Sequence, residues 1–561
     1  MEKSYLIFGI AALGLAAALQ FREAGRFEEM RRMRQESVVA AVVPHQPTPI
    51  VLQKSVDAID APAGERFFLE NDAMSVKILA NGGGIESIAL KKYPAALHGD
   101  GPWQFHPSGQ PALSLALLPA GGERMPLLDV PFAPIAARAD SITLQGTLAD
   151  GTTVTREYRM GSKGEPYQIR HLLRIVPSTA AGRAMAIAVS LGSLTPGAGD
   201  PSLLQFVSYD GKKAKFTSPR AFGASGGFFG IGRRGERTRI EETRPTAWAA
   251  LKNQFFTAIL TPDVAALGAT TFSAAGIGGA IGGSVELPMA MAGHETVLAM
   301  DYYVGPKEYA RLERMGQNQD LVMQFGWFGF IGKILLLMMM GIHHIVPNWG
   351  WTILLLTLIV RLLLWPLTGA QVRSSRALAR LQGPIREIQA RHKNHPKKVQ
   401  EETLRLFREA GVNPAAGCLP ILIQIPIFFG LYAMLRSASE LRFASFFWIA
   451  DLSAADTVGH IGQFSINPLP LLMAATTFLQ MHLSPTPSSS PGQRLLFQAM
   501  PFIFLCFAYN LPSGLVLYWT VQNCCSIVQQ RIIQRRLARQ EKEIKPQREG
   551  KKKKSRTATR H

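Results

Sequence analysis

The chain has 561 residues, of which 47% are apolar and only 18% are charged, and its formal net charge is +20. Such an apolar chain is not intrinsically disordered, and its four cysteines are too few for a disulfide-stapled secreted protein. A chain that is both apolar and basic is typical of a membrane protein with basic segments on one side of the bilayer. Its cysteines and histidines show no metal-ligand spacing, and it contains no GxxxxGKS/T phosphate loop. We therefore expect neither a metal nor another cofactor.

The amino-terminal stretch 5–19 is apolar and follows Lys3. Two alternatives fit it. It is a cleaved signal peptide, because Ala16, Ala17 and Ala18 offer small residues for a peptidase, or it is a membrane anchor over 1–24. Because other apolar stretches follow, we favour the anchor. The next segment, 25–55, contains proline at 44, 47 and 49 and is predicted to be a linker.

The region 56–320 shows short alternating segments separated by glycine-rich turns. Examples are 75–79, 85–90, 152–159 and 168–175, and the run Asn81-Gly82-Gly83-Gly84 separates the first two. Short strands with regular turn signals predict an all-β sandwich. The glycine-rich run 223–235 is interpreted as a loop.

Five further apolar stretches near 349–368, 418–435, 466–483, 495–509 and 511–530 approach the ~20 residues that a helix needs to cross a bilayer. Together with the first stretch they predict six membrane spans. The segment 321–346 contains glycines, Lys333, His343 and His344, which favours an amphipathic helix lying on the outer membrane surface. The two histidines are adjacent, so on a helix they diverge by about 100° and make poor shared metal ligands.

The basic residues predict the topology. Segment 369–417 carries ten Lys or Arg against four acidic residues, and 531–561 carries thirteen against three. Both are expected in the cytoplasm, whereas 437–465, with three acidic residues and one arginine, is expected outside. Both termini are then cytoplasmic and the β-region lies on the outer side. We predict a helical hairpin at 369–417 and a basic cytoplasmic tail at 536–561. The lysine-rich part of this tail, Lys551 to Lys554 with Arg548 and Arg556, is predicted to be disordered, since it has no apolar residues to fold it.

One full charge, Arg361, lies inside a predicted span. An arginine at the centre of a span costs about 2.5–3.5 kcal/mol on insertion scales. The spans contain no acidic partner but do contain polar residues, namely Thr357, Gln424, Thr476, Thr477, Gln480, Gln522 and Asn523. An unpaired arginine among such groups suits a water-filled cavity, where it would attract acidic groups of a passing chain. The alternative is that Arg361 extends to the cytoplasmic interface, because Pro366 follows only five residues later.

Motifs in the second half of the chain carry a family resemblance. The region 345–535 resembles the YidC membrane protein insertase family, in the form with a large periplasmic domain. The matching stretches are Asn348-Trp349-Gly350-Trp351, Val360-Arg361, Trp365-Pro366-Leu367-Thr368, Val412-Asn413-Pro414, Gly417-Cys418-Leu419-Pro420, Gln424-Ile425-Pro426, Asp451-Leu452-Ser453, Pro512-Ser513-Gly514, Tyr518-Trp519 and Gln522-Asn523.

The resemblance implies a polytopic α-helical protein of the bacterial inner membrane, with an insertase core at 347–535 and a periplasmic β-supersandwich of the sugar-mutarotase type. It implies that the protein inserts and folds inner-membrane proteins, alone or with the Sec translocon, and that the basic hairpin and tail face the ribosome. Arg361 matches the family's groove arginine, and Thr357, Tyr518 and Trp519 fall at groove and substrate-contact positions. With Gln424 and Gln522 these residues form the predicted substrate groove, without catalytic residues.

Two other classes of protein remain as alternatives. A polytopic transporter or channel would also place polar residues in its spans, but it would more often show paired repeats, and none is found. An enzyme with a sugar-active domain at 50–320 would need an acid pair or histidines, and this region offers no convincing set.

Overall fold

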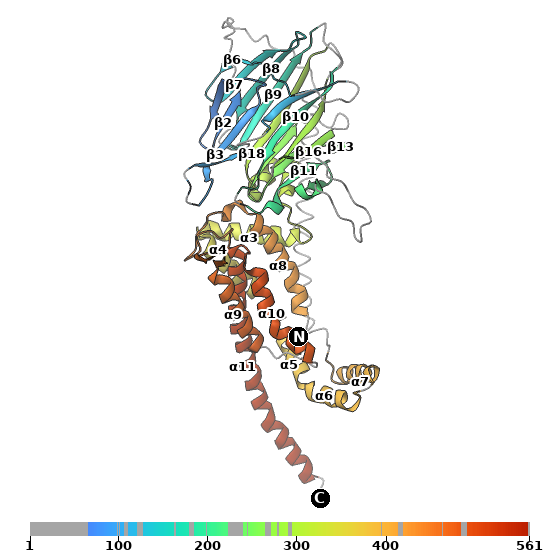
Figure 1. Cartoon of the computed structure of the whole chain (residues 1–561). Helices are drawn as coiled ribbons and strands as arrows, with labels where there is room; N and C mark the ends of the chain where they lie inside the picture. The colour runs from blue at the N-terminus through green and yellow to red at the C-terminus, as the bar shows by residue number, and fades with distance from the viewer. Residues whose placement is uncertain are drawn as a thin grey trace.

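A computed structural model of the chain describes residues 65–558, except for 98, 100, 106–109, 120–126, 162–163, 179–183, 198, 223–238, 244, 264–270, 278–279, 290–293, 394, 413–418, 463 and 484–490. The anchor predicted for 1–24, the linker at 25–55 and the loop at 223–235 lie outside the described residues. Figure 1 shows β-sheets at one end of the molecule and helices at the other.

Two antiparallel sheets make up the first part of the chain. One has the order β1-β2-β3-β5-β10-β17-β16-β13, with β4 paired to β3, and the other has the order β12-β11-β14-β15-β18-β9-β8-β7-β6. The strands of the first sheet are β1 (Arg66–Glu70), β2 (Met74–Leu79), β3 (Ile85–Pro94), β4 (Pro102–Phe105), β5 (Ala112–Pro119), β10 (Ala184–Leu194), β13 (Arg239–Thr243), β16 (Thr271–Ile277) and β17 (Ala280–Pro288). Those of the second are β6 (Ala133–Ala137), β7 (Ser141–Thr147), β8 (Thr153–Met160), β9 (Gln168–Val176), β11 (Gln205–Tyr209), β12 (Ala214–Thr217), β14 (Trp248–Lys252), β15 (Phe256–Pro262) and β18 (Thr296–Pro306).

The alternating sequence pattern produces the core between these sheets. In β2, Met74, Val76 and Ile78 are fully buried while the residues between them are partly exposed. The Tyr302 hydroxyl of β18 donates to the Leu191 carbonyl of β10 at 2.8 Å and so joins one sheet to the other. The all-β prediction for this region is confirmed. Its supersandwich type stays a prediction.

A buried arginine ties the two sheets together near the predicted glycine turn. Gly82 and Gly83 have φ of 70° and 62°, and a Cβ on Gly82 would lie 2.4 Å from the Leu128 carbonyl oxygen. Arg156 on β8 is fully buried and donates to the carbonyls of Gly82 and Leu113 and, at 3.4 Å, to His171 Nε2. This guanidinium therefore fastens the turn between β2 and β3 to the opposite sheet.

Helices make up most of the rest of the described chain. They are α2 (Tyr309–Met315), α3 (Gly329–Ile345), α4 (Trp349–Leu363), α5 (Trp365–Arg380), α6 (Gln382–Arg391), α7 (Pro396–Glu409), α8 (Leu419–Ser437), α9 (Pro468–Leu483), α10 (Pro491–Ala508) and α11 (Ser513–Ala558). Short 3-10 turns occur at Pro201–Leu203, Pro219–Ala221, Gln319–Met323 and Ser439–Leu441, and a hairpin is formed by β19 (Gly459–Ile461) and β20 (Phe464–Ile466).

The predicted surface helix at 321–346 is helical only in part. Its first residues belong to a 3-10 turn, and α3 begins at Gly329. Gly332 of α3 meets Gly430 of α8 so closely that a Cβ on Gly332 would lie 2.9 Å from the Gly430 carbonyl oxygen. Lys333 pairs with Glu313 of α2 at 3.2 Å. The helix is thus held against both its neighbours, and its place on the membrane surface stays a prediction.

The later helices occupy each of the other predicted spans. No single helix in the described part of the chain has both the length and the apolar composition of a membrane crossing. Taken together, α4 and the helix segment Trp365–Arg391 have both properties, with a bend of 59° between them. The disorder predicted for the tail is wrong, because α11 continues to Ala558. Lys, Arg, Glu and Gln, which dominate the tail, are all good helix formers.

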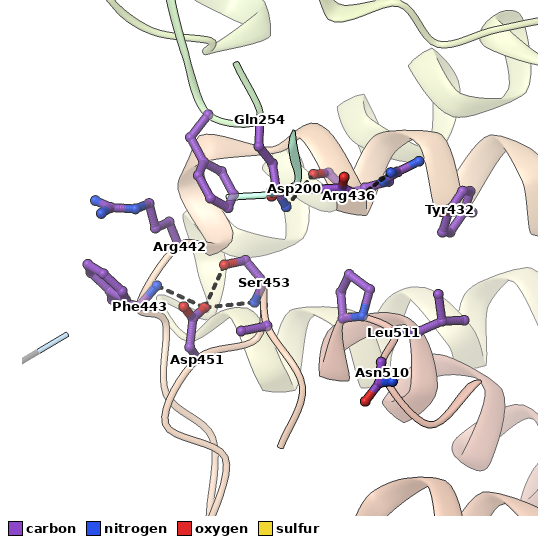
Figure 2. A pocket seen from close by; sticks show the side chains of 13 residues that line it. Asp200, Gln254, Tyr432, Arg436, Arg442, Phe443, Asp451, Ser453, Asn510 and Leu511 are labelled. Atoms are coloured by element: carbon purple, nitrogen blue, oxygen red, sulfur yellow. Dashed lines mark hydrogen bonds and ion pairs between the residues drawn. The ribbon is translucent and has the colours of Figure 1, made fainter. Parts of the chain in front are cut away.

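The sheets are fastened to the helices through the end of α8. Arg436 pairs with Asp200, which precedes the 3-10 turn Pro201–Leu203, and the Gln254 amide donates to the Arg436 carbonyl at 3.1 Å. A few residues later, Arg442 donates to the carbonyls of Pro94 and Ala95 at 2.7 and 2.9 Å. A cavity of about 220 Å³ lies at this junction, and Figure 2 shows the side chains that line it. The contacts fix the sheet domain on one end of the helices.

We predict that the sheet domain loses stability in acid because of His171. Burial, and secondly Arg156, hold the pKa of His171 well below its ordinary value, so the folded state keeps this ring neutral. The unfolded chain protonates it below about pH 6.5 and binds more protons, so stability falls by up to ~1.4 kcal/mol per pH unit below that value. His171→Gln keeps an acceptor for Arg156 without titrating. Thermal unfolding followed by circular dichroism should show a flatter acid dependence in this variant, and identical slopes would contradict the assignment.

Candidate functional site

The predicted groove arginine lies near the end of α4. Asn348 caps the start of this helix by accepting from the Trp351 backbone N–H at 3.2 Å. Ile353, Leu356, Thr357 and Val360 form its buried face, whereas Leu358, Ile359, Leu362 and Leu363 are exposed. Arg361 is half-buried at the edge between the two faces. This helix therefore presents Arg361 beside an apolar outer surface.

Arg361 is held by neutral acceptors on α11. Its Nη2 donates to the Gln522 carbonyl at 3.2 Å and to the Ser526 hydroxyl. Ser526 in turn donates to the same Gln522 carbonyl at 2.8 Å. Within the described ranges no carboxylate lies at ion-pair distance from Arg361, so its charge is solvated by hydrogen bonds and not cancelled by an opposite charge.

A third helix adds to this group. The Gln424 amide of α8 donates to the Gln522 side-chain oxygen at 3.3 Å. Tyr518, one turn before Gln522 on α11, is almost fully buried and lies within electrostatic reach of both Gln424 and Arg361. The structure therefore brings four of the six predicted groove residues together with Ser526. We call Arg361, Gln424, Tyr518, Gln522 and Ser526 the arginine cluster.

In the part of the chain that the structure describes, the other two predicted groove residues make no hydrogen bond to the arginine cluster. Thr357 is 1% exposed, and its hydroxyl donates to the Ile353 carbonyl of its own helix at 2.7 Å. Trp519 packs edge-on against Phe428 and Phe504, with ring centroids 5.0 and 4.9 Å away. Both residues shape the helix packing around the cluster.

Further polar residues predicted to face Arg361 form a separate network. The Asn523 amide donates to the hydroxyls of Thr477 and Thr476 at 2.8 and 3.2 Å. These bonds join α11 to α9. A polar side chain next to Gln522 in the sequence thus points to a different helix, because successive helical residues diverge by about 100°.

Ser526 was missed by the sequence reasoning. The signal was present, because Tyr518, Gln522 and Ser526 follow one another at a spacing of four, which places them on one helix face. The position is identified by its spacing along the helix, and not by the presence of an amide or a threonine. In the described residues no group of three or more His, Cys, Asp or Glu is placed to hold a metal ion.

Two family models match the chain. One, described as "60Kd inner membrane protein", matches residues 341–541, and the other, described as "YidC periplasmic domain", matches residues 66–338. A protein called membrane protein insertase YidC from Nitratidesulfovibrio vulgaris (strain DP4) is 34% identical over 396 residues, which cover 68% of this chain and 69% of that protein. This chain belongs to the YidC family. Accordingly, it is an inner membrane protein with a β-sheet periplasmic domain and a helical core.

Other similarities are either shorter or lower in sequence identity. The membrane protein insertase YidC of Endomicrobium trichonymphae is 38% identical over 239 residues, 42% of this chain and 46% of that protein. The chain thus spans about half the length of that relative. A solved structure of an active YidC insertase with its first transmembrane domain resolved is 19% identical, and the match covers 89% of this chain and 98% of that one with a TM-score of 0.34. Family membership therefore rests on the sequence matches.

We predict that Ser526 stabilises the helical core more than Thr357 does. Ser526→Ala removes an acceptor for a charged donor, which is worth about 1.5–3 kcal/mol. Thr357→Val removes only a bond to its own helix, as does the matched control Thr520→Val, whose hydroxyl donates to the Val516 carbonyl at 2.8 Å. Thermal unfolding in detergent should give the lowest unfolding temperature for Ser526→Ala, and the two threonine variants should have similar unfolding temperatures. Equal losses in all three would show that Arg361 gains nothing from Ser526.

Proposed function

We propose that this protein inserts and folds inner-membrane proteins through a hydrophilic groove that opens toward the cytoplasm, alone or beside the Sec translocon. Its substrates are nascent membrane proteins. The observation that carries the proposal is the arginine cluster, in which a half-buried cation on α4 has only neutral acceptors among the residues that the structure describes. Family membership supports the same function, since the relatives above bear the name of insertases.

The mechanism follows from the cost of moving polar chain through hydrocarbon. A substrate segment of about 20 apolar residues gains free energy by entering lipid. Its polar flank must cross first, and each unsatisfied backbone group there costs several kcal/mol. A wet groove around Arg361 shortens this passage, and the guanidinium attracts acidic residues in the flank. Transfer of the apolar segment supplies the driving force, so we propose no catalytic step and no cofactor.

The proposed topology has six spans with both termini in the cytoplasm. The sheets, the start of α4, the end of α8 and the start of α9 then lie on the periplasmic side. On the cytoplasmic side lie α5, α6, α7 and the end of α11. Figure 1 supports this arrangement, because the second group lies at the end of the molecule opposite the sheets. We also propose that the sheet domain has the supersandwich fold of sugar mutarotases but no sugar chemistry.

We predict that the charge of Arg361 governs the insertion of acidic substrates. In liposomes containing the full chain, a test protein should be made with an acidic, neutral or basic translocated flank. Arg361→Ala should slow the acidic flank by at least about tenfold, which corresponds to ~1.4 kcal/mol at the crossing step. The neutral flank should be affected less, because Gln424 and Gln522 still wet the groove. Arg361→Lys should retain most activity, since the charge is kept.

The same liposomes separate the proposal from its alternatives. Equal rates for acidic and neutral flanks with Arg361→Ala would reject charge attraction but leave the insertase assignment intact. Unchanged rates for every flank would favour an Arg361 that merely extends to the interface. Passage of small solutes without protein insertion would favour a transporter or channel.

We propose that the basic end of α11 binds the ribosome. The residues Lys551, Lys552, Lys553 and Lys554 continue this helix beyond the bundle, and phosphate groups of RNA attract such a cluster. Truncation of 541–561 should reduce cosedimentation with ribosomes, and the effect should weaken in high salt. A control in which the four lysines become glutamines keeps the helix and removes charge. Unchanged cosedimentation with both variants would favour attraction to anionic lipid instead, at about 1 kcal/mol per basic residue.

A further inference from the structure

Two segments between α8 and α9 expose large apolar side chains. At a tight turn, Phe447 is 76% exposed and Trp448 is 49% exposed. On the β19–β20 hairpin, Ile461 is 71% exposed and Phe464 is 80% exposed. We call Phe447, Trp448, Ile461 and Phe464 the apolar crest.

The turn holds its aromatic side chains outward by fixed backbone geometry. Phe446 and Ile449 exchange two backbone hydrogen bonds of 2.8 and 2.9 Å around Phe447 and Trp448. Phe447 has φ of 50°, which is unusual and unfavourable for a bulky residue. The Trp448 indole donates to Asp456 at 3.2 Å, and Asp456 also accepts from the Leu469 N–H at the start of α9. The exposed side chains of Phe447 and Trp448 therefore lie on an ordered turn that is hydrogen-bonded to α9.

The hairpin has an apolar face and a polar face. Ile461 pairs with Phe464, and the next pair, His460 with Ser465, points to the opposite side because side chains alternate along a strand. The base of the hairpin is fixed, since the Tyr509 hydroxyl donates to the Ser465 carbonyl at 2.6 Å and the Asn467 amide donates to the Tyr509 carbonyl at 2.7 Å. A two-faced, anchored hairpin suits a boundary between water and an apolar phase.

The crest lies at the end of the helical core that faces the sheets. Trp351, in the first turn of α4, packs against Phe447 with ring centroids 6.2 Å apart and is itself 49% exposed. Further along, α4 exposes Leu358 and Ile359, and α9 exposes Leu471 and Leu472 near its start. The crest thus continues the apolar outer surface of two helices beyond their periplasmic ends.

We infer that the apolar crest inserts into the outer leaflet of the inner membrane, at the boundary between headgroups and acyl chains, and anchors this end of the helical core. The residue types of the crest are consistent with this position, because aromatic side chains are enriched at membrane interfaces. Helix length agrees as well: α4 and α9 have 15 and 16 residues, or roughly 22 and 24 Å, against a hydrocarbon thickness of ~30 Å. The inference rests on the topology proposed above.

The experiment places one nitroxide label at a time on the full chain in vesicles of phosphatidylethanolamine and phosphatidylglycerol. The native cysteines Cys418, Cys506, Cys524 and Cys525 are first replaced by serine. Phe464→Cys reports on the crest, His460→Cys on the polar face of the same hairpin, and Leu358→Cys on the outer face of α4. Collision rates with oxygen, which concentrates in lipid, are compared with those of a water-soluble nickel chelate.

We expect the label at 464 to favour oxygen several-fold more than the label at 460, and to approach the label at 358. Lipid exposure at 358 with water exposure at 464 would overturn the crest as a membrane anchor and would favour a surface that awaits a protein partner. Water exposure at 358 would reject the proposed topology instead. Brominated lipids, which quench tryptophan fluorescence, provide a second measurement without cysteine changes. If Trp448 lies in the membrane, the quenched fraction of the tryptophan fluorescence should be smaller in Trp448→Phe than in the unmodified chain. An unchanged quenched fraction would equally overturn the inference.

Discussion

Arg361 puts a permanent positive charge between α4 and α11, and the cost of keeping it there constrains the helical core. Among the described residues, only neutral groups accept hydrogen bonds from this charge: the backbone carbonyl of Gln522 and the hydroxyl of Ser526. Gln424 and Tyr518 extend the polar group to α8. Three helices must therefore stay in register for the guanidinium to remain solvated, and any loss of that register leaves a charge without partners.

A second arginine shows how differently the same chemistry can be used. Arg156 is fully buried, and its guanidinium is satisfied by two carbonyls and an imidazole. It cannot meet a substrate, and it serves to hold the Gly82 turn against the other sheet. Among the described residues, Arg361 has its hydrogen-bond acceptors on α11 alone, and it is half-buried. This difference in exposure, more than the residue type, makes Arg361 the candidate for contact with a passing chain.

The junction between the sheets and α8 attaches the periplasmic domain to the helical core. Arg436, Arg442 and Gln254 connect the end of α8 to three separate parts of the sheet domain. Arg442 also lies over the rings of Phe443 and Phe256, at 4.1 and 5.4 Å, so its contact combines hydrogen bonds with cation–π attraction. Through α8 this junction is continuous with Gln424, which belongs to the arginine cluster.

The sequence alone determined that a β-sheet domain precedes a helical core, that strands alternate around Asn81-Gly82-Gly83-Gly84, and that a charged residue, Arg361, lies within an apolar segment. These features depend on local periodicity, turn chemistry and residue type. Only the tertiary structure decided which polar residues meet. Gln522 and Asn523 are neighbours in the chain, yet one belongs to the arginine cluster and the other binds Thr477 on α9. Thr357 bonds to its own helix, Trp519 joins an aromatic group, and Ser526 reaches Arg361 from a position 165 residues away. Such pairings depend on the rotation and register of helices against one another, which composition and spacing within one segment do not contain.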